Sequence, residues 1–298
     1  HLRLFKEIFM NKLPFGNVAV VAFGDIMQIA PVKGTAVFKE VSRRNKQIHA
    51  HQSVDNLWHK FSVIILKTNH RQGEDGEYAE LLNRLRVGAC TEDDVKMLDS
   101  RVTRIQDIPE GALYVAGSNA DVNHFNSLQL SKLSGELVPL KASVFSDTRG
   151  VIKQPLLKPD GAISGTSLQY EIKLKIGCRV MLTTNLDVCD GLVNGSLGTV
   201  LGFEYNKKNQ IQYIMVKFDD KGDGRRRRKD FDFEAKYPGE NATAIERFET
   251  RFSQSKDQGS PSSQATAIGF PLKLCYAVTA HKIQGSTIKK PKILILKL

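Results

Sequence analysis

Apolar residues in the first part of the chain fall into two patterns that alternate along the sequence. Three short runs are continuously apolar: VAVVAF (18–23), SVIIL (62–66) and ALYVA (112–116). Uninterrupted runs of this length are typical of strands that a parallel sheet buries on both faces. We therefore predict three central strands, the first of which leads directly into the corner Gly24-Asp25.

Between these runs the apolar residues recur at helical spacing. Apolar side chains at positions 2, 5, 8 and 9 predict a helix that stops at Pro14 and Gly16, and those at 78, 81, 82 and 85 predict another that Gly88 ends. Thr91, three residues before Asp94, is the expected N-cap of a further short helix. Strands that alternate with helices in this way indicate an α/β sheet.

The pattern changes between about residues 165 and 235. The segments CRVMLT, LGTVLGF and IQYIMVKF are separated by clusters of Gly, Asn and Asp, with no helical segment between them. Short strands at this spacing predict a small antiparallel barrel, in which Asn194-Gly195 forms a tight turn. Residues 219–264 are polar and predict a mobile loop. LKLCYAVTAHKIQGSTI and KILILKL then return to α/β character, so the barrel is predicted to be inserted into the α/β domain.

Composition and charge narrow the class of protein. The 298 residues include 43 Lys and Arg against 32 Asp and Glu, a formal net charge of +11 that favours polyanionic partners such as nucleic acid. No apolar run approaches the roughly 18 residues of a membrane span. The four cysteines form no CxxC pair, so neither a disulfide framework nor a zinc site is expected.

Three polar segments carry candidate chemistry. In Gly24-Asp25-Ile26-Met27-Gln28 a carboxylate and an amide follow a predicted strand, where NTPase sheets hold a magnesium-bound water and sense a terminal phosphate; a polar turn is the favoured alternative when the segment is taken alone. Arg71 follows the second predicted strand. It could act as an arginine finger that contacts the terminal phosphate, or it could be a solvated arginine in a loop, which is the favoured alternative when Arg71 is taken alone.

The third segment, Thr279 to Thr287, is the most specific. It follows the apolar run CYAV and reads TAHKIQGST. Its glycine, Gly285, allows backbone to approach a phosphate closely, and His281 and Lys282 supply donors to a nucleic-acid backbone. The alternative is an ordinary strand-to-helix loop, in which these hydrogen-bonding side chains and the glycine would have come together by chance.

Two further features leave alternatives open. Asn119 and Asn123 follow the third predicted strand and suit either DNA contact or capping of a helix. The basic run Arg225–Lys229 could grip phosphate, although runs of charge are more often solvated loops.

Four ordered blocks resemble a known family. VVAFGDIMQIAPV, TNHRQGEDGEYAELLNRLRVG, IGCRVMLTTNLDVCDGLVNGSLGTV and AVTAHKIQGSTI stand in the order and rough spacing of the Pif-type (petite integration frequency) DNA helicases, which are RecD-related superfamily-one helicases and include those of Helitron-like transposons. The resemblance implies a RecA-like P-loop NTPase helicase core with a parallel sheet and an inserted SH3-like barrel. It places a remnant of the first RecA-like domain at 1–55, the second at 56–164 and 266–298, and the barrel with the basic loop at 165–265.

The resemblance also implies residue roles. Asp25, Gln28 and Arg71 would be catalytic, Gly24, Gln28, Arg71, Gln284 and Gly285 would bind nucleotide, and Thr279, His281, Lys282 and Asn119 would bind DNA. ATP and Mg²⁺ are the implied cofactors, no residue of this chain being assigned as a metal ligand. Single-stranded and forked DNA are the implied partners, acted on by a monomer with no membrane association. Nuclear localisation is expected, with mitochondria as the alternative.

The departures from the family pattern predict an incomplete chain. A phosphate loop needs GxxxxGK[ST], yet none of the 23 glycines is followed by lysine, and no Asp-Glu pair supplies a Walker B element. We therefore expect an internal portion of an ATP-dependent DNA helicase that unwinds DNA 5′ to 3′ in repair, recombination, telomere maintenance or transposon replication. The alternative is a non-catalytic single-stranded DNA-binding fragment or a degenerate transposon relic.

Overall fold

A computed structural model describes residues 8–10, 13–28, 36–39, 57–66, 76–104, 107–108, 112–146, 150–152, 154–254, 263–283 and 295–297. The chain divides into two compact units, residues 1–102 and 103–298, and each is described by itself. No helix in the described parts of the chain has the length and apolar character needed to cross a membrane.

The regular elements in the described parts of the first unit are all helices. Its elements are the 3-10 helices η1 (Pro14–Asn17) and η2 (Leu57–Lys60) and the α-helices α3 (Gly76–Arg86) and α4 (Glu92–Asp99). α3 ends at Arg86, two residues before the predicted stop at Gly88, whose φ of +70° is easily adopted by glycine and whose N–H donates to the Leu85 carbonyl. Thr91 caps α4, so the predictions of both helices are confirmed.

The first two predicted strands are wrong. Residues 18–23 and 62–66 are irregular, and their apolar side chains are exposed, to 89% at Phe23 and 85% at Ile64. A strand forms only where its backbone N–H and C=O groups pair with a neighbour, and neither segment joins a sheet among the described residues. The apolar pattern indicated a preference for burial but not the partner that would provide it. The helix predicted over residues 2–9 lies almost wholly outside the described residues.

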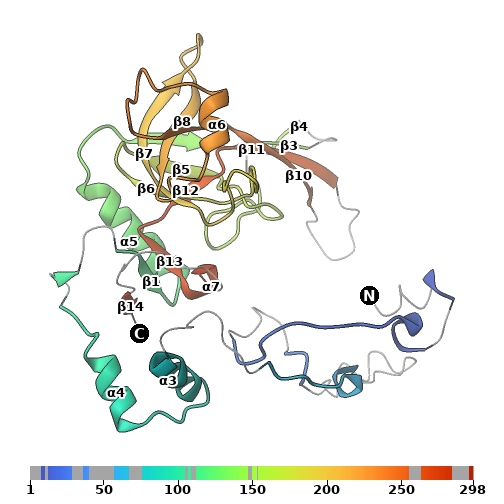
Figure 1. Ribbon diagram of the computed structural model, residues 1–298. Helices are drawn as coiled ribbons and strands as arrows, with labels where there is room; N and C mark the ends of the chain where they lie inside the picture. The colour runs from blue at the N-terminus through green and yellow to red at the C-terminus, as the bar shows by residue number, and fades with distance from the viewer. Residues whose placement is uncertain are drawn as a thin grey trace. The chain divides into compact units, whose positions relative to one another are not determined.

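The second unit begins with a parallel sheet. Strand β1 (Tyr114–Ala116) lies between β13 (Ala277–Thr279) and β14 (Ile295–Lys297), parallel to both, and α5 (Asn119–Lys132) packs beside it (Figure 1). This confirms the prediction of a parallel α/β sheet containing 112–116 and the C-terminal segments. β1 and β13 are neighbours in the sheet although about half of the chain separates them in sequence.

The intervening segment is rich in antiparallel strands. One sheet has the order β12-β6-β7-β8-β9, formed by Leu272–Leu274, Arg179–Leu182, Leu197–Tyr205, Ile211–Phe218 and Ala242–Ile245. All its neighbouring pairs are antiparallel, and Leu182, Val200, Ile214 and Leu272 are fully buried in its core. The three strands predicted here are therefore confirmed.

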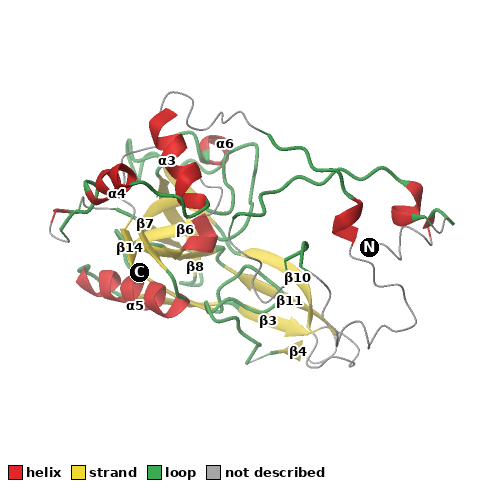
Figure 2. Ribbon diagram, turned by 90° about the horizontal axis from the view of Figure 1, so that it is seen from below, coloured by secondary structure: helices red, strands yellow, loops and turns green. Residues whose placement is uncertain are grey.

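The described part of this unit also contains two smaller sheets and two short helices. The first sheet has the order β10-β11-β3-β4, formed by Phe248–Gln254, Ser263–Gly269, Ser143–Ser146 and Gly150–Val151 (Figure 2). The second pairs β2 (Val138–Lys141) with β5 (Glu171–Leu174), and the helices are α6 (Arg225–Asp230) and α7 (Ala280–Ile283). Because β3 pairs with β11, this part joins residues on both sides of the predicted boundary at 164/165.

Two predictions about the turns of this unit have opposite outcomes. The tight turn at Asn194-Gly195 is confirmed, since Ser196 N–H donates to the Val193 carbonyl and Gly195 has φ +102°. The mobile loop predicted for 219–264 is wrong over 219–254, which contains α6, β9 and β10. The polar composition of this segment concealed buried residues, among them Ala242 and Ala244 of β9 and Phe252 of β10.

Candidate functional site

A cleft of about 380 Å³ lies in the second unit where α5 and the ends of β5, β12 and β13 meet. Three of its lining residues, Asn119, Thr279 and Lys282, were predicted from the sequence to bind DNA. Thr279 is the last residue of β13 and is paired in register with Ala116, the last residue of β1. Because the carboxyl ends of parallel strands meet at one edge of a sheet, the chain that follows each strand reaches the same place.

Helix α5 is fixed to strand β13 by a buried amide. Asn126 is 6% exposed, and its Oδ1 accepts hydrogen bonds from the backbone N–H groups of Tyr276 (2.8 Å) and Ala277 (2.9 Å). Its Nδ2 donates to the Ala277 carbonyl at 3.4 Å. These bonds join the middle of α5 to the start of β13. Asn126 was missed by the sequence analysis, because a single Asn within a helix carries no signal of what it contacts.

The start of α5 corrects one interpretation. The N-cap is Ser118, whose Oγ accepts from the Asp121 N–H at 3.1 Å. Asn119 is the first helical residue and therefore does not cap the helix. Both Asn119 and Asn123 line the cleft instead.

The cleft carries more positive than negative charge. Its lining includes the lysines Lys158, Lys173, Lys273 and Lys282 and the carboxylates Asp160 and Glu171. Lys158 donates to the Thr166 carbonyl at 2.6 Å, and Lys173 lies 3.9 Å from Glu171. Burial lowers the pKa of Lys273, and the neighbouring charge of Lys282 lowers it further. The ammonium groups of Lys273 and Lys282 therefore repel each other. An anion bound between them in the cleft would reduce this repulsion.

The remaining residues of the TAHKIQG segment divide into two groups. His281 lies on α7 and is exposed, and it is not part of the cleft lining, unlike Lys282. Gln284 and Gly285 lie outside the described residues. The structure therefore brings Thr279, Lys282 and Asn119 together and leaves His281 apart from them.

In the first unit the segment Gly24 to Gln28 forms a polar turn. The Asp25 carboxylate accepts from the Met27 N–H (3.0 Å), from Gln28 Nε2 (3.3 Å) and from an Arg86 guanidinium N–H (2.5 Å). Asp25 and Gln28 are thus in direct contact, while Arg86 from the end of α3 neutralises the carboxylate. Gly24 has no atom near the space that a side chain would occupy. Arg71 lies outside the described residues.

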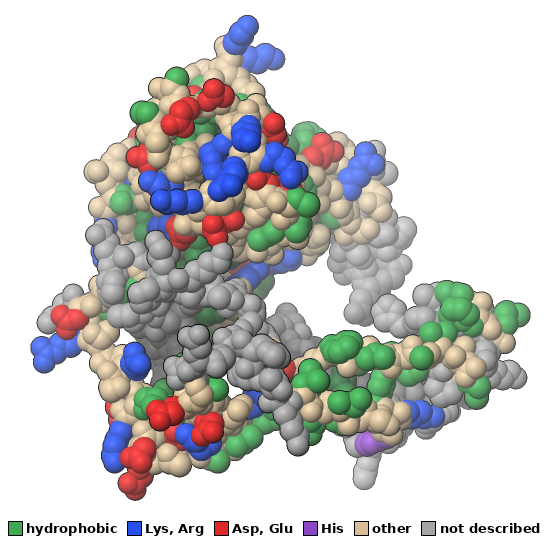
Figure 3. All heavy atoms as spheres, viewed as in Figure 1, with side chains coloured by type: hydrophobic (Ala, Val, Ile, Leu, Met, Phe, Trp, Pro, Cys, Tyr) green, Lys and Arg blue, Asp and Glu red, His purple; other side chains and the backbone are tan. Residues whose placement is uncertain are grey.

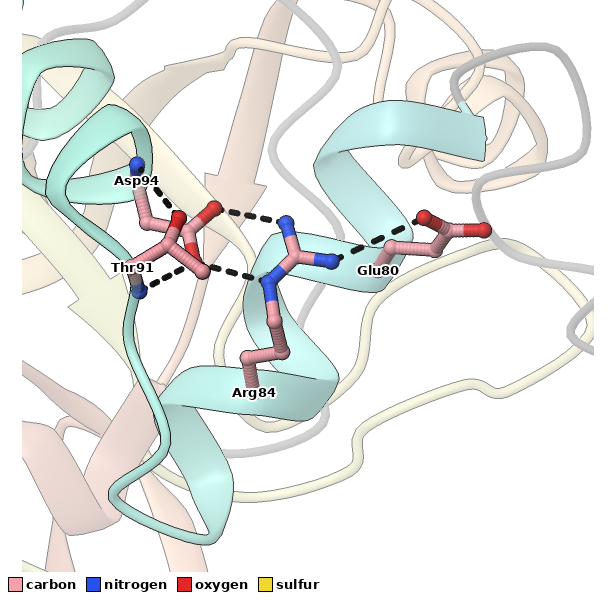
Figure 4. Close-up of polar contacts among 4 residues, drawn as sticks. All are labelled: Glu80, Arg84, Thr91 and Asp94. Atoms are coloured by element: carbon pink, nitrogen blue, oxygen red, sulfur yellow. Dashed lines mark hydrogen bonds and ion pairs between the residues drawn. The ribbon is translucent and has the colours of Figure 1, made fainter.

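Helices α3 and α4 are held together by the ion pair shown in Figure 4. Arg84 Nε and Nη2 donate to the two Asp94 carboxylate oxygens at 2.7 and 2.6 Å, and Glu80 lies 3.6 Å from the same guanidinium. Asp94 also completes a capping box with Thr91. The hydrogen bonds from Arg84, followed by that from the Thr91 N–H, hold the pKa of Asp94 well below its usual range. This pair joins two helices of the first unit.

The residues of this chain do not fit a complete nucleotide site. A triphosphate needs a glycine-rich loop with a lysine, and no glycine in the sequence is followed by lysine. The Asp25 carboxylate, which could face a magnesium-bound water, is already occupied by Arg86. Among the described residues no group of His, Cys, Asp and Glu side chains is arranged to hold a metal ion.

Comparison with known proteins gives a consistent result. A family model described as PIF1-like helicase matches residues 3–96, and one described as DNA helicase Pif1, 2B domain matches residues 167–203. The ATP-dependent DNA helicase PIF7 of Trypanosoma brucei brucei is 26% identical over 92% of this chain and 29% of its own length. The ATP-dependent DNA helicase PIF1 of Saccharomyces cerevisiae is 32% identical over 66% of this chain and 21% of its own length. The chain thus spans less than a third of the length of either relative.

The fold agrees with these matches. The crystal structure of Bacteroides Pif1 bound to ssDNA superimposes with a TM-score of 0.59 at 23% identity, covering 99% of this chain and 59% of that one. This likeness supports the RecA-like core with its parallel sheet. Two family models at separate places in the sequence, curated relatives and a shared fold all lead to one conclusion: the chain belongs to the PIF1-like helicase family.

Proposed function

We propose that this chain is part of an ATP-dependent DNA helicase and that its own residues bind single-stranded DNA in the cleft of the second unit. The observation that carries the proposal is the convergence of Asn119, Thr279 and Lys282, from two strand ends, on a cleft with four lysines and two carboxylates. Lysines neutralise phosphates, and amide and hydroxyl groups complete the hydrogen bonds to the backbone. The names of the relatives and the DNA-bound family structure support the same partner.

The finer parts of the proposal come from the family resemblance. The complete protein would unwind forked DNA 5′ to 3′ as a monomer, in DNA repair, recombination, telomere maintenance or transposon replication, in the nucleus or mitochondria. It would use ATP and Mg²⁺, with Asp25, Gln28, Arg71, Gln284 and Gly285 contributing to the nucleotide site. The antiparallel sheet of β6 to β9 would be the SH3-like insertion, and His281 would contact DNA outside the cleft lining.

A binding measurement tests the cleft. The affinity for a fluorescent oligo(dT) is measured by anisotropy over a series of salt concentrations for the 298-residue chain, Lys282→Ala and a control, Lys132→Ala. Lys132 is an exposed lysine at the end of α5 that does not line the cleft. Lys282→Ala should weaken binding and reduce the slope of log affinity against log salt by about 1. Equal behaviour of the two variants would contradict the proposed cleft.

The second candidate is a DNA-binding chain that hydrolyses nothing. The absence of any Gly-Lys pair from the sequence favours it for this chain taken alone. The two candidates agree on the DNA site and differ only in whether a complete protein adds the phosphate loop.

A further inference from the structure

The five consecutive basic residues Arg225–Lys229 form most of helix α6 instead of the predicted solvated loop. An α-helix turns about 100° per residue, so positions 225, 226 and 229 fall on one face and positions 227 and 228 on the other. The burial of the side chains follows this division, since Arg225, Arg226 and Lys229 are exposed and Arg227 and Arg228 are half-buried. A run that is uniform in sequence therefore has two faces in the fold.

The inner face attaches α6 to strand β9. Arg227 Nε donates to the Ala244 carbonyl at 2.6 Å, and its Nη2 donates to Glu246 at 2.7 Å. Arg228 donates to the Asp223 carbonyl at 2.6 Å and to the Thr243 hydroxyl at 3.0 Å. These two arginines bond to β9 through the Ala244 carbonyl and the Thr243 hydroxyl, and to the turn before α6 through the Asp223 carbonyl, which is a structural role.

The outer face has few partners. Arg225, Arg226 and Lys229 line a cavity of about 450 Å³ together with Cys189, Asp190 and Gly222. The side chains of Arg225 and Lys229 form no hydrogen bond or ion pair with the part of the chain that the structure describes. Arg226 has one distant carboxylate partner, Asp187 at 3.8 Å, and its side chain is 64% exposed. Figure 3 shows a group of Lys and Arg side chains gathered at the position of α6 in Figure 1, with acidic side chains at its margin.

The nearest buried acid is occupied by the backbone of the helix. The Asp190 carboxylate oxygens accept from the backbone N–H groups of Arg226 (2.7 Å) and Arg227 (3.0 Å). The Asp190 carbonyl accepts from the Gly224 N–H at 2.8 Å, and Gly224 has φ +74° where a Cβ would strike Thr243. The start of α6 is thus fixed, and with it the face of the helix from which Arg225, Arg226 and Lys229 project.

We propose that Arg225, Arg226 and Lys229 form a second phosphate-binding surface, on α6, that contacts the backbone of a nucleic acid apart from the cleft lined by Thr279 and Lys282. Three cations face solvent with one carboxylate at ion-pair distance, so their N–H donors are available to an anion. The arginine forks suit phosphate oxygens, and the lysine adds a flexible point charge. Such contacts are independent of base sequence, and either single-stranded or duplex DNA can supply them.

The test compares a variant that lacks the three outer charges of α6 with a control variant that lacks three other exposed charges. The variant Arg225→Gln/Arg226→Gln/Lys229→Gln is matched by Lys132→Gln/Lys207→Gln/Lys208→Gln, which removes three exposed lysines from elsewhere in the second unit. Affinity for oligo(dT) and for a hairpin duplex is measured over a salt series. If all three contacts form on a single strand, the log–log slope should fall by about 2 in the first variant, at roughly 0.7 for each phosphate. The control should change it much less.

Stability measurements separate binding from folding. The outer-face variant should keep the melting temperature of the unaltered chain, whereas Arg227→Gln should lower it. Should the outer-face variant prove unstable, the single variants Arg225→Gln and Lys229→Gln each remove one exposed charge and should each lower the slope on a single strand by roughly 0.7.

The outcomes distinguish the two surfaces. A loss confined to one of the two DNA probes identifies the form of nucleic acid that α6 contacts. A loss in the outer-face variant with none in Lys282→Ala would support α6 and remove the cleft. Slopes equal to those of the control variant on both probes, or no binding of either probe by the chain, would overturn the proposal.

Discussion

Lys273 shows most clearly how a single residue acquires its properties from its surroundings. It lies in the middle of β12, half-buried, with Lys282 from α7 beside it in the same cleft. Burial and the like charge both favour the neutral amine, while Asp160 acts weakly in the opposite direction. Its charge is therefore easier to remove than that of an ordinary surface lysine, and a bound phosphate would restore it.

The affinity of the cleft for DNA should depend on pH through Lys273. Because the pKa of Lys273 is lowered, its ammonium loses the proton at a lower pH than an ordinary lysine, and binding to phosphate should weaken as the pH rises. Lys273→Arg keeps the charge at all of these pH values and should flatten the profile. The measurement is oligo(dT) affinity from about pH 7 to about pH 10 at constant ionic strength. Identical profiles for the two proteins would show that Lys273 does not contact the phosphates.

At the scale of elements, α5 depends on one amide for its position. Asn126 bonds to the backbone of Tyr276 and Ala277, so the helix after β1 is joined to the strand that carries Thr279. Val122 and Leu130 lie one turn before and after it on the same buried face. The cleft exists because these apolar contacts and this amide hold two distant segments together.

Replacing Asn126 should therefore destabilise the fold. Asn126→Ala leaves the buried N–H groups of Tyr276 and Ala277 without an acceptor, at a cost of about 1–3 kcal/mol for each group. Asn123→Ala is the matched control, since it removes an exposed amide from the same helix. Chemical denaturation should show a clear loss for the first variant and little change for the second. Comparable losses would mean that the helix itself, not its bond to β13, determines stability.

At the scale of the whole molecule, a charge of +11 and an incomplete nucleotide site make DNA binding and ATP turnover separable. The chain has the family's fold, while the phosphate-loop lysine is absent from its sequence. Its two compact units carry different parts of the predicted chemistry, Asp25 in the first and Thr279 in the second.

ATP turnover should accordingly require the complete helicase. The 298-residue chain with oligo(dT) should release no phosphate above background, because the groups that stabilise the transferring phosphoryl are absent. In the complete protein Arg71→Ala should lower turnover by roughly 10³-fold, with DNA affinity almost unchanged. A phosphate-release assay checks both. Turnover by the chain alone that Asp25→Ala abolishes would contradict the first expectation, and near-normal turnover by the Arg71→Ala helicase would contradict the second.

The sequence by itself determined the family, the parallel strand at 112–116, the three antiparallel strands and the helix signals at Gly88 and Thr91. These features depend on local conformational preferences or on motifs with fixed spacing. Thr279, Lys282 and Asn119 could be named as DNA-binding candidates for the same reason, because two of them stand in one motif and the third directly follows a strand.

Only the tertiary structure decided which residues meet. The pairing of β1 with β13 brings Asn119 near Thr279. The helical turn of α6 places Arg227 and Arg228 on the face toward β9 and its other three basic residues on the exposed face. Asn126 and Lys273 were missed because their roles are set by neighbours about 150 residues away or on another element. The apolar runs at 18–23 and 62–66 were predicted as strands but join no sheet among the described residues. An apolar run forms a strand only where the fold supplies a neighbouring strand to pair with. Local preference is encoded residue by residue, but contact depends on which segments the fold places side by side.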